Sequence, residues 1–177
     1  MRQWIWQQRW ARYSRMFDFS PQPGASKPDL YAALLQAADA LTADEPDAVA
    51  NMANTAALLG EFIADCNWAG FYRMVDGELV LGPFVGRPAC IRIPLGVGVC
   101  GAAAEGETQL VPDVHAFAGH IACDALTRSE LVVPIIRDDA VIAVIDLDSP
   151  SEARFDDEDQ AGVELSLIHI SEPTRPY

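Results

Sequence analysis

The sequence lacks long apolar runs and is poor in basic residues. No stretch approaches the ~20 apolar residues that a membrane-spanning helix needs, and no secretory signal pattern follows the basic start. Lys and Arg number 12 against 26 Asp and Glu, which gives a formal net charge of −14. Such an acidic chain is poorly suited to binding a phosphate backbone. We therefore expect no nucleic-acid partner, no membrane contact and a cytoplasmic location.

The cysteines also lack the spacing of familiar frameworks. There are 4 of them, at Cys66, Cys90, Cys100 and Cys123. Nothing indicates secretion, so a structural disulfide framework is not expected. Cys100 and Cys123 together with His115 and His120 could offer zinc four ligands, but no pair has the C-x2-C spacing of a structural zinc site. We therefore expect no metal and no cofactor.

Length and composition indicate a single domain. Half of the 177 residues are hydrophobic, which is enough for a substantial core. Residues 1–27 are basic and end in a proline-rich stretch, so we expect a poorly ordered N-terminal extension. Residues 166–177 (SLIHISEPTRPY) abandon the helical pattern and resemble translated sequencing-adapter sequence. We expect them to be a non-native tail that replaces the end of the last helix, which leaves residues 28–165 as the domain.

The periodicity of apolar residues changes along that domain. Helical spacing comes first, then strand-like alternation interrupted by turn residues, then a last helix. The expected helices are 29–43, 46–65, 102–105 and one from about 155 to 165; the expected strands are 68–74, 78–84, 90–93, 109–111, 131–136 and 141–147. This order predicts an α+β domain with a largely antiparallel sheet.

The cysteines differ in their surroundings. Cys66 follows an amphipathic helix and is interpreted as a small buried hydrophobic residue. The other three lie in segments rich in glycine, proline or loop-forming residues. Cys100 follows a glycine-rich helix entry, where the helix N-terminus would stabilise a thiolate, and Cys123 comes three residues after His120, whose imidazolium could do the same. Three thiols that converge in a reducing compartment indicate redox cycling or metal binding.

Three acids form a second constellation. Glu130 opens one expected central strand, and Asp146 and Asp148 end the next. If the two strands pair through the turn between them, Glu130 falls opposite Leu147, between the two aspartates, and the acids gather near Cys123. A solvated sheet edge is the simpler interpretation for one acid. Three together favour a site that binds a cation or holds a proton at a raised pKa.

Two aromatic residues complete the candidate site. Trp68 and Tyr72 lie on the same face of an expected strand, with Gly70 between them. Aromatic residues at such spacing usually fill a core. The glycine leaves space above the strand, however, and that space would suit a small ligand against an aromatic wall.

Several segments in combination resemble the GAF-domain free methionine-(R)-sulfoxide reductases. The resemblance spans roughly residues 29–165 and rests on Asn67–Tyr72, Leu81–Phe84, Pro88–Pro94, Gly98–Gly101, Asp113–His115, Gly119–Cys123 and Asp146–Ser149. It implies a GAF fold, with a six-stranded antiparallel sheet and helices on its faces, and commonly a homodimer. It also implies reduction of free L-methionine-(R)-sulfoxide through a cysteine sulfenic acid and a disulfide, which thioredoxin reduces.

The resemblance also implies roles for single residues. Cys123 matches the nucleophile and Cys90 the resolving cysteine, while Cys100 matches a third redox cysteine whose role could be exchanged with that of Cys123. The acids that match those holding the amino group and assisting protonation of the sulfoxide are Glu130, Asp146 and Asp148. The aromatics that match the pocket wall are Trp68 and Tyr72. The alternative function is a GAF sensor that binds a small ligand or responds to redox state without turnover.

Overall fold

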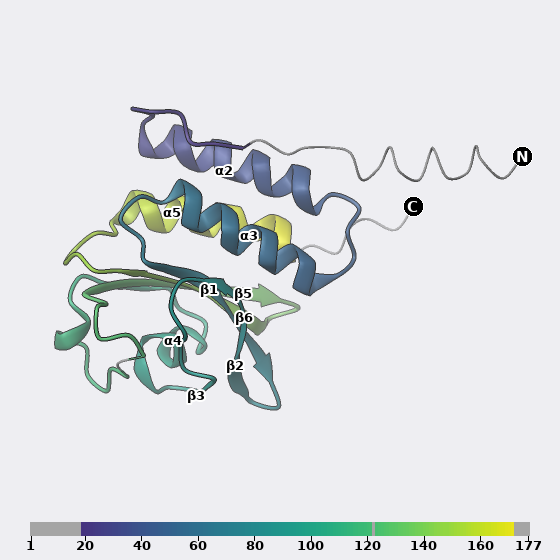
Figure 1. Ribbon diagram of the computed structural model, residues 1–177. Coiled ribbons are helices and arrows are strands. Elements are labelled where there is room, and N and C mark those ends of the chain that lie inside the picture. Colours follow the sequence, from purple (N-terminus) through teal and green to yellow (C-terminus); the bar gives the residue numbers. More distant parts are fainter. Residues whose placement is uncertain (1–18, 122, 172–177) are drawn as a thin grey trace, which may run out of the picture.

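The computed structural model describes residues 19–121 and 123–171, with side chains up to residue 165. Helices α3 (Ala48–Phe62) and α5 (Asp157–Ser171) lie on one face of a sheet, and α2 (Lys27–Thr42) packs over them on the side away from the sheet. The short helix α4 (Gly98–Ala103) and the longer loops lie on the other face (Figure 1). The sheet therefore separates a helical layer from a loop-rich layer.

All strand pairs in the sheet are antiparallel. Its order is β3-β2-β1-β6-β5-β4. The strands are β1 (Trp68–Val75), β2 (Glu78–Val85), β3 (Arg92–Pro94), β4 (Gln109–Val111), β5 (Ser129–Arg137) and β6 (Ala140–Ser149). The expected six-stranded antiparallel sheet with helices on its faces is confirmed.

Two tight hairpins set the order of the central strands. Asp76 and Gly77 link β1 to β2 with φ angles of 53° and 84°, and Asp138 and Asp139 link β5 to β6 with 52° and 59°. Two successive residues with positive φ form a type I′ turn, whose twist matches that of paired strands. The expected hairpins therefore form. In the second hairpin, two aspartates adopt backbone conformations that glycine or asparagine adopts more easily.

The register of the β5–β6 hairpin differs from the one we expected. Ile136 pairs with Val141 but Ile135 pairs with Ala143, so that Ile142 is left over as a bulge. Beyond the bulge every pair is shifted by one residue, and Glu130 faces Asp148 rather than Leu147. A shift of one residue moves a side chain to the other face of a sheet. The bulge therefore places Glu130 on the face that carries the two aspartates.

The ends of the helices also differ from the sequence pattern. The helix expected from residue 29 begins at Lys27, because the Ser26 hydroxyl accepts a hydrogen bond from the Asp29 amide and caps it. The last helix does not stop at Leu165 but continues to Ser171. Residues 1–18 and 172–177 lie outside the described residues, so the extension and the non-native tail stay predictions.

The first and last helices are joined by ion pairs. The Lys27 ammonium lies 2.6 Å from Asp156 and 2.7 Å from Asp159, and the Tyr31 hydroxyl donates to Asp159 at 2.9 Å. Gly162 of α5 packs against the Tyr31 ring, leaving no room for a side chain. Residue 27, assigned to the extension from the sequence, thus contacts the domain.

Each face of the sheet has its own apolar core. Side chains of the helical layer pack with Phe71, Leu131 and Ile145 on one face. On the other face Tyr72 and Val132 pack with residues of α4 such as Val99. Side chains along one strand alternate between these two cores.

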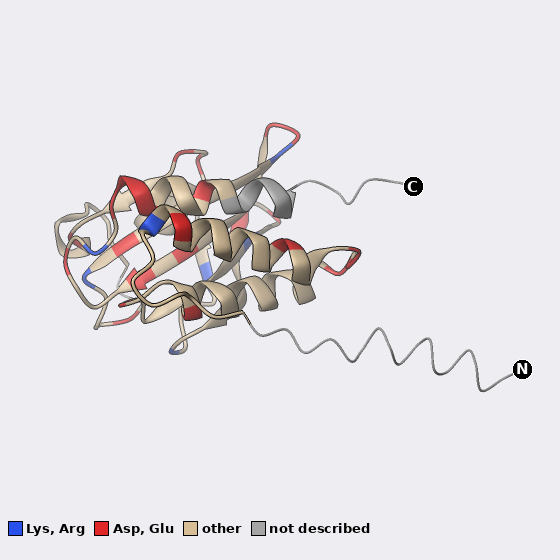
Figure 2. Ribbon diagram, turned by 90° about the horizontal axis from the view of Figure 1, so that it is seen from above, with Lys and Arg blue, Asp and Glu red and all other residues tan. Residues whose placement is uncertain are grey.

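Acidic residues outnumber basic residues over the molecule. Acidic residues lie at helix ends, in turns and along the sheet, with few basic residues among them (Figure 2). Within the described ranges, none of the helices has both the length and the apolar character needed to cross a bilayer.

Candidate active site

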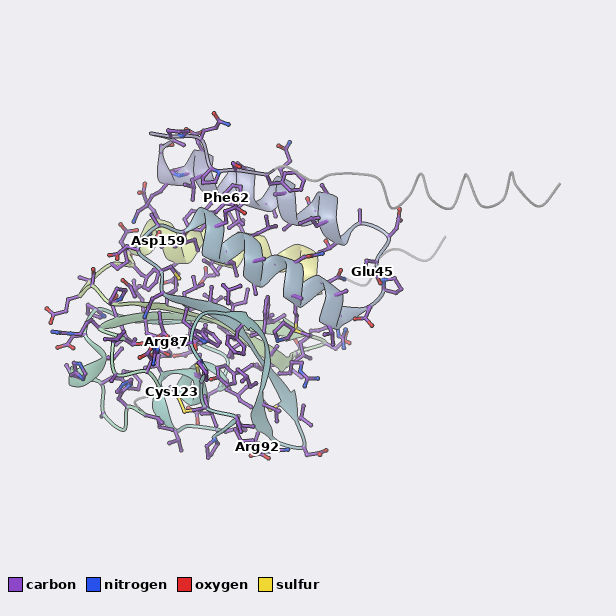
Figure 3. The ribbon with its side chains drawn as sticks, in the orientation of Figure 1. Glu45, Phe62, Arg87, Arg92, Cys123 and Asp159 are labelled. Atoms are coloured by element: carbon purple, nitrogen blue, oxygen red, sulfur yellow. A yellow bond between two sulfur atoms is a disulfide. The ribbon has the colours of Figure 1, made fainter. Side chains whose placement is uncertain are left out.

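A disulfide joins two loops on the face of the sheet opposite the three helices. Cys90 lies between β2 and β3, Cys123 lies in the loop before β5, and their Cα atoms are 5.4 Å apart. Cys123 and Arg87 lie in the loop layer, whereas Phe62 and Asp159 lie among the helices (Figure 3). Both disulfide cysteines are half-buried. The structure therefore joins the two cysteines that the resemblance marks as nucleophile and resolving cysteine.

A second contact holds the two cysteine loops together. The Trp68 indole N–H donates to the Arg87 carbonyl oxygen at 3.0 Å, and Nε of Arg87 lies 3.8 Å from Oδ2 of Asp124. Arg87 is three residues before Cys90, and Asp124 directly follows Cys123. An ion pair thus bridges the same two loops as the disulfide.

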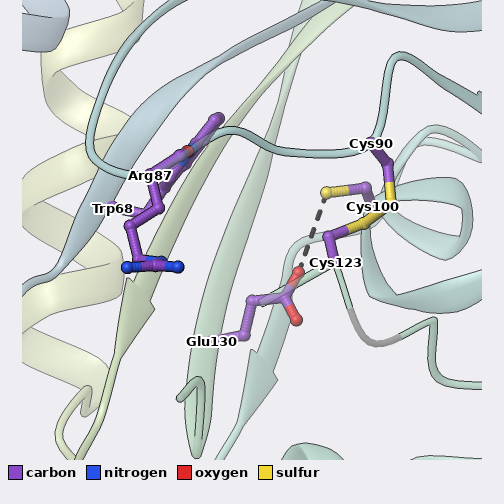
Figure 4. The surroundings of a disulfide bond; sticks show 6 residues. All are labelled: Trp68, Arg87, Cys90, Cys100, Cys123 and Glu130. Carbon is purple, nitrogen blue, oxygen red and sulfur yellow. Dashed lines mark hydrogen bonds between the residues drawn. A yellow bond between two sulfur atoms is a disulfide. The ribbon is translucent and has the colours of Figure 1, made fainter. Parts of the chain in front are cut away.

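Cys100 is a free thiol beside this disulfide (Figure 4). It is the third residue of α4, and its Sγ lies 3.7 Å from Oε1 of Glu130. The expectation that the helix would stabilise its thiolate is wrong. Burial, and then the negative charges of Asp146 and Glu130, raise the pKa of the Cys100 thiol well above its ordinary value. The α4 helix also begins at Gly98, ahead of the expected residue 102, so Cys100 lies inside its first turn.

A close backbone contact positions α4. The Gly96 amide donates to the Gly101 carbonyl oxygen at 2.9 Å. A Cβ atom at Gly101 would lie only 2.5 Å from the Pro94 carbonyl oxygen. The glycine therefore lets α4 approach the end of β3, and this approach places Cys100 beneath the disulfide loops.

The three acids gather on one face of the sheet. Glu130 pairs with Asp148 across β5 and β6, and Asp146 comes two residues earlier on the same face. Burial is the main reason why the pKa of Asp146 is raised to about 6. Burial, followed by the charges of neighbouring aspartates, raises the pKa values of Glu130 and Asp148 well above their ordinary range. The cluster therefore holds protons at a pH where isolated carboxyl groups are ionised.

These groups line a pocket whose empty volume, mouth included, is about 390 Å³. Its lining is mixed apolar and acidic: Tyr72, Ile93, Val97, Gly98, Val99, Cys100, His120, Ile121, Cys123, Asp124, Thr127, Glu130, Asp146 and Asp148. The described lining residues include four acids and no Lys or Arg. Burial, and then His115, lowers the pKa of His120, so a proton on its ring does not balance the acids at neutral pH.

Three polar lining residues were not assigned to the pocket from the sequence. Asp124 and Thr127 were missed, and His120 was considered as an activator of Cys123 and as a zinc ligand, but not as part of a pocket wall. All three lie within four residues of Cys123, so proximity to a candidate nucleophile was the one signal in the sequence. Their loop has no periodicity from which side-chain directions could be read.

Trp68 does not take the place expected from the sequence. Its ring stacks on Phe84 with centroids 5.2 Å apart and on Tyr72 at 5.9 Å. A Cβ atom at Gly70 would lie 2.7 Å from the Trp68 ring and 2.4 Å from Cβ of Phe84. The space above Gly70 is thus filled by aromatic side chains and is not open to a ligand. Tyr72 lines the pocket, whereas Trp68 supports it from behind.

Comparisons with known proteins agree with this architecture. The GAF domain family matches residues 47–171. The free methionine-R-sulfoxide reductase of Escherichia coli K12 is 50% identical over 146 residues, which cover 82% of this chain and 88% of that protein.

Solved structures give the same result. The free methionine-R-sulfoxide reductase of Neisseria meningitidis, in complex with its substrate, superposes with a TM-score of 0.83 at 43% identity, over 88% of this chain and 94% of that chain. A putative GAF sensor protein from Burkholderia vietnamiensis superposes with a TM-score of 0.81 at 54% identity, over 84% of this chain and 95% of that chain. The chain therefore belongs to the GAF-domain family, in the group that contains the free methionine-R-sulfoxide reductases.

Proposed function

We propose that this protein reduces free L-methionine-(R)-sulfoxide to methionine. The observation that carries the proposal is the Cys90–Cys123 disulfide at an acidic pocket, with Cys123 itself in the pocket lining. A redox-active pair next to a small-molecule pocket supports turnover of a ligand that accepts two electrons. Two of the relatives described above, from Escherichia coli and Neisseria meningitidis, are free methionine-R-sulfoxide reductases.

The proposed reaction transfers the sulfoxide oxygen to a cysteine. The thiolate of Cys123 attacks the sulfoxide sulfur while the oxygen gains a proton. The oxygen then moves to the cysteine sulfur, methionine leaves reduced by two electrons, and Cys123 becomes a sulfenic acid. The Cys90 thiol displaces the hydroxyl group as water and forms the disulfide. A dithiol of thioredoxin reduces that disulfide by exchange and is itself oxidised.

Cys123 is the better nucleophile of the two pocket cysteines. The thiolate is the reactive form, and burial beside acids disfavours it at Cys100. Cys123 is half-buried and its sulfur already reaches Cys90. We therefore assign the attack to Cys123 and the resolving step to Cys90.

The acids divide two tasks between them. Burial raises the pKa of Glu130 well above its ordinary value, which favours the protonated form, and this proton can be donated to the sulfoxide oxygen. Asp146, with a pKa of about 6, is ionised at neutral pH and offers a carboxylate to the substrate ammonium group. A methionine sulfoxide residue within a peptide has no ammonium group, which accounts for a preference for the free amino acid.

Thioredoxin is the proposed reductant. Ile91, next to Cys90, and Leu126, three residues after Cys123, are 72% and 57% exposed. Apolar side chains beside a half-buried disulfide would let an oxidoreductase dock with its own thiol close to the bond. We further propose that the protein acts as a cytoplasmic homodimer, as the family resemblance implies.

The proposal is tested by turnover of the R and S epimers with thioredoxin, thioredoxin reductase and NADPH. With the wild-type protein, the coupled assay should consume NADPH when the R epimer is added but not when the S epimer is added. Cys123→Ser should lose this activity. Cys66→Ser is the matched control and should retain it, because Cys66 lies outside the pocket lining.

Two results would contradict the proposal in different ways. If Cys123→Ser keeps the wild-type rate, the assignment of the nucleophile is wrong. If neither epimer is turned over by the wild-type protein, a GAF sensor function takes the place of the reductase.

A further inference from the structure

The strongest unassigned feature is a group of three potential metal ligands at the base of the pocket. Sγ of Cys100 and one carboxylate oxygen each from Glu130 and Asp146 all lie within 4.8 Å of one another, and all three residues are buried. Cys100 and Glu130, which a dashed line joins, lie beside the disulfide (Figure 4). This set shares only Cys100 with the Cys/His set considered from the sequence.

One buried carboxylate oxygen in this group has no hydrogen-bond partner. Asp146 is only 6% exposed, and within the described part of the chain its buried Oδ1 accepts no hydrogen bond. A buried acceptor without a partner carries a substantial desolvation cost. Because no Lys or Arg side chain is among the described lining residues, a cation from solution is the partner that fits.

The distance between Cys100 and Glu130 fits zinc in particular. Zn–S bonds of about 2.3 Å and Zn–O bonds of about 2.1 Å place the sulfur and oxygen ligands of a tetrahedral ion about 3.6 Å apart. Sγ of Cys100 and Oε1 of Glu130 are 3.7 Å apart. Three protein ligands leave a fourth position, which the pocket can fill with water. Calcium and magnesium prefer oxygen ligands alone, so the thiol favours zinc.

We propose that Cys100, Glu130 and Asp146 bind one Zn²⁺ ion in the pocket, and that this ion excludes the substrate amino group. Binding involves no change of oxidation state: the Cys100 thiol and any protonated carboxyl group release their protons to solvent. Zinc binding itself is independent of the proposed reductase activity. The competition with substrate rests on that proposed function.

In the oxidised protein, Cys90 and Cys123 cannot bind a metal ion as thiolates, so the proposed site can be measured without them. With Cys90 and Cys123 joined, Cys66 and Cys100 are the two free thiols of the chain. Titration of the full-length oxidised protein with Co²⁺ should give one equivalent of bound metal and a sulfur-to-cobalt charge-transfer band. Addition of Zn²⁺ should remove the band.

Matched variants assign the band to the proposed ligands. Cys100→Ser should abolish it, Asp146→Asn should weaken metal binding about tenfold or more, and Cys66→Ser should leave both unchanged. A wild-type protein without the band, or a band lost in Cys66→Ser and kept in Cys100→Ser, overturns the proposal. Circular dichroism establishes that each variant is folded. A further readout needs no variant: bound Zn²⁺ should protect Cys100 of the wild-type protein from an alkylating reagent.

Competition and turnover separate the two proposals. Methionine sulfoxide should raise the Co²⁺ concentration at half-saturation several-fold. If methionine sulfoxide leaves this concentration unchanged, the metal ion does not exclude the substrate amino group. Turnover is measured separately with EDTA present. Turnover without metal binding overturns only the zinc site, and metal binding without turnover overturns only the reductase.

Discussion

At the scale of single residues, the base of the pocket combines two buried acids with a buried thiol. Glu130 and Asp146 are each 6% exposed and Cys100 is 5% exposed. Burial of charge is costly unless a partner compensates it. These side chains therefore make the pocket ready for a cation or a proton at the expense of stability.

The pKa of Asp146 predicts how activity depends on pH. Protonation of this carboxylate, as the pH falls through about 6, removes the partner of the substrate ammonium. We expect kcat/KM for the R epimer to fall on the acid side of about pH 6, approaching tenfold per pH unit. Initial rates across buffers of constant ionic strength measure this. A profile that is flat between pH 5 and 7 would remove Asp146 from binding.

The same shift predicts a change in stability. Because burial raises the pKa of Asp146 from 3.8 to about 6, its ionised form destabilises the native state, and this cost is fully present above about pH 6. Asp146→Asn should therefore raise the Tm by several degrees at pH 8, and by less at pH 5.5, where the native state largely holds the proton. The measurement is thermal unfolding at both pH values.

Asp113→Asn, at an exposed 3-10 helix cap, is the matched control for that substitution. It should not raise the Tm at either pH. If Asp146→Asn is less stable than wild type at pH 8, the prediction is wrong, and other interactions in the native state offset the cost of burying the ionised Asp146 carboxylate.

At the scale of elements, α2 and α5 pack through a glycine. A Cβ atom at Gly162 would lie 2.2 Å from Cγ of Tyr31. In an exposed helix interior, replacement of glycine by alanine stabilises by about 1 kcal/mol, but here we expect overpacking to dominate. Gly162→Ala should lower stability by about 1–3 kcal/mol, measured by urea unfolding. Ala161→Gly, at the exposed neighbouring position, should cost only about 1 kcal/mol.

In the β5–β6 turn, by contrast, we expect a substitution to increase stability. Asp139 has a φ of 59°, which costs a residue with a side chain about 1 kcal/mol or more. Asp139→Gly should therefore stabilise the protein by about 1 kcal/mol without a change in kcat/KM. Asp157→Gly, in the first turn of α5, is the control and should destabilise. Equal loss from both substitutions would contradict the role of the turn conformation.

Sequence reasoning found the elements of this hairpin but not its register. The turn residues and the apolar runs predicted both strands. Val and Ile fill both faces of a buried strand, so their order does not mark which face is which. The bulge at Ile142 therefore left no signal, and the face of Glu130 could not be predicted from the pattern. The pattern named the three acids that the structure brings together, but it gave Glu130 the wrong pairing partner.

At the scale of the whole molecule, the disulfide closes a loop between two segments 33 residues apart. Closing a loop of that length stabilises a protein by about 3–4 kcal/mol through the unfolded state. We expect the oxidised protein to unfold at a higher temperature than the reduced one, by several degrees. Thermal unfolding with and without a phosphine reductant measures the difference. Cys90→Ser should abolish it, and Cys66→Ser should leave it unchanged.

The global architecture was the most predictable level. Periodicity gave the α+β class and the antiparallel sheet, because apolar spacing reports directly on helices and strands. The irregular segment around His120 and Asp124 has no such spacing, and its side chains reach the pocket only through tertiary packing. The filled space above Gly70 was equally hidden, since Phe84, which fills it, comes from another strand.

The two cores on opposite faces of the sheet have a consequence for how this protein can change. In β5, Leu131 and Val133 face the helical layer, while Glu130 and Val132 face the pocket. Adjacent positions of one strand are thus under separate constraints, one on folding and one on chemistry. New substrate preferences can arise by substitution at alternate residues while the helical core stays intact, so the strand allows specificity to evolve without redesign of the fold.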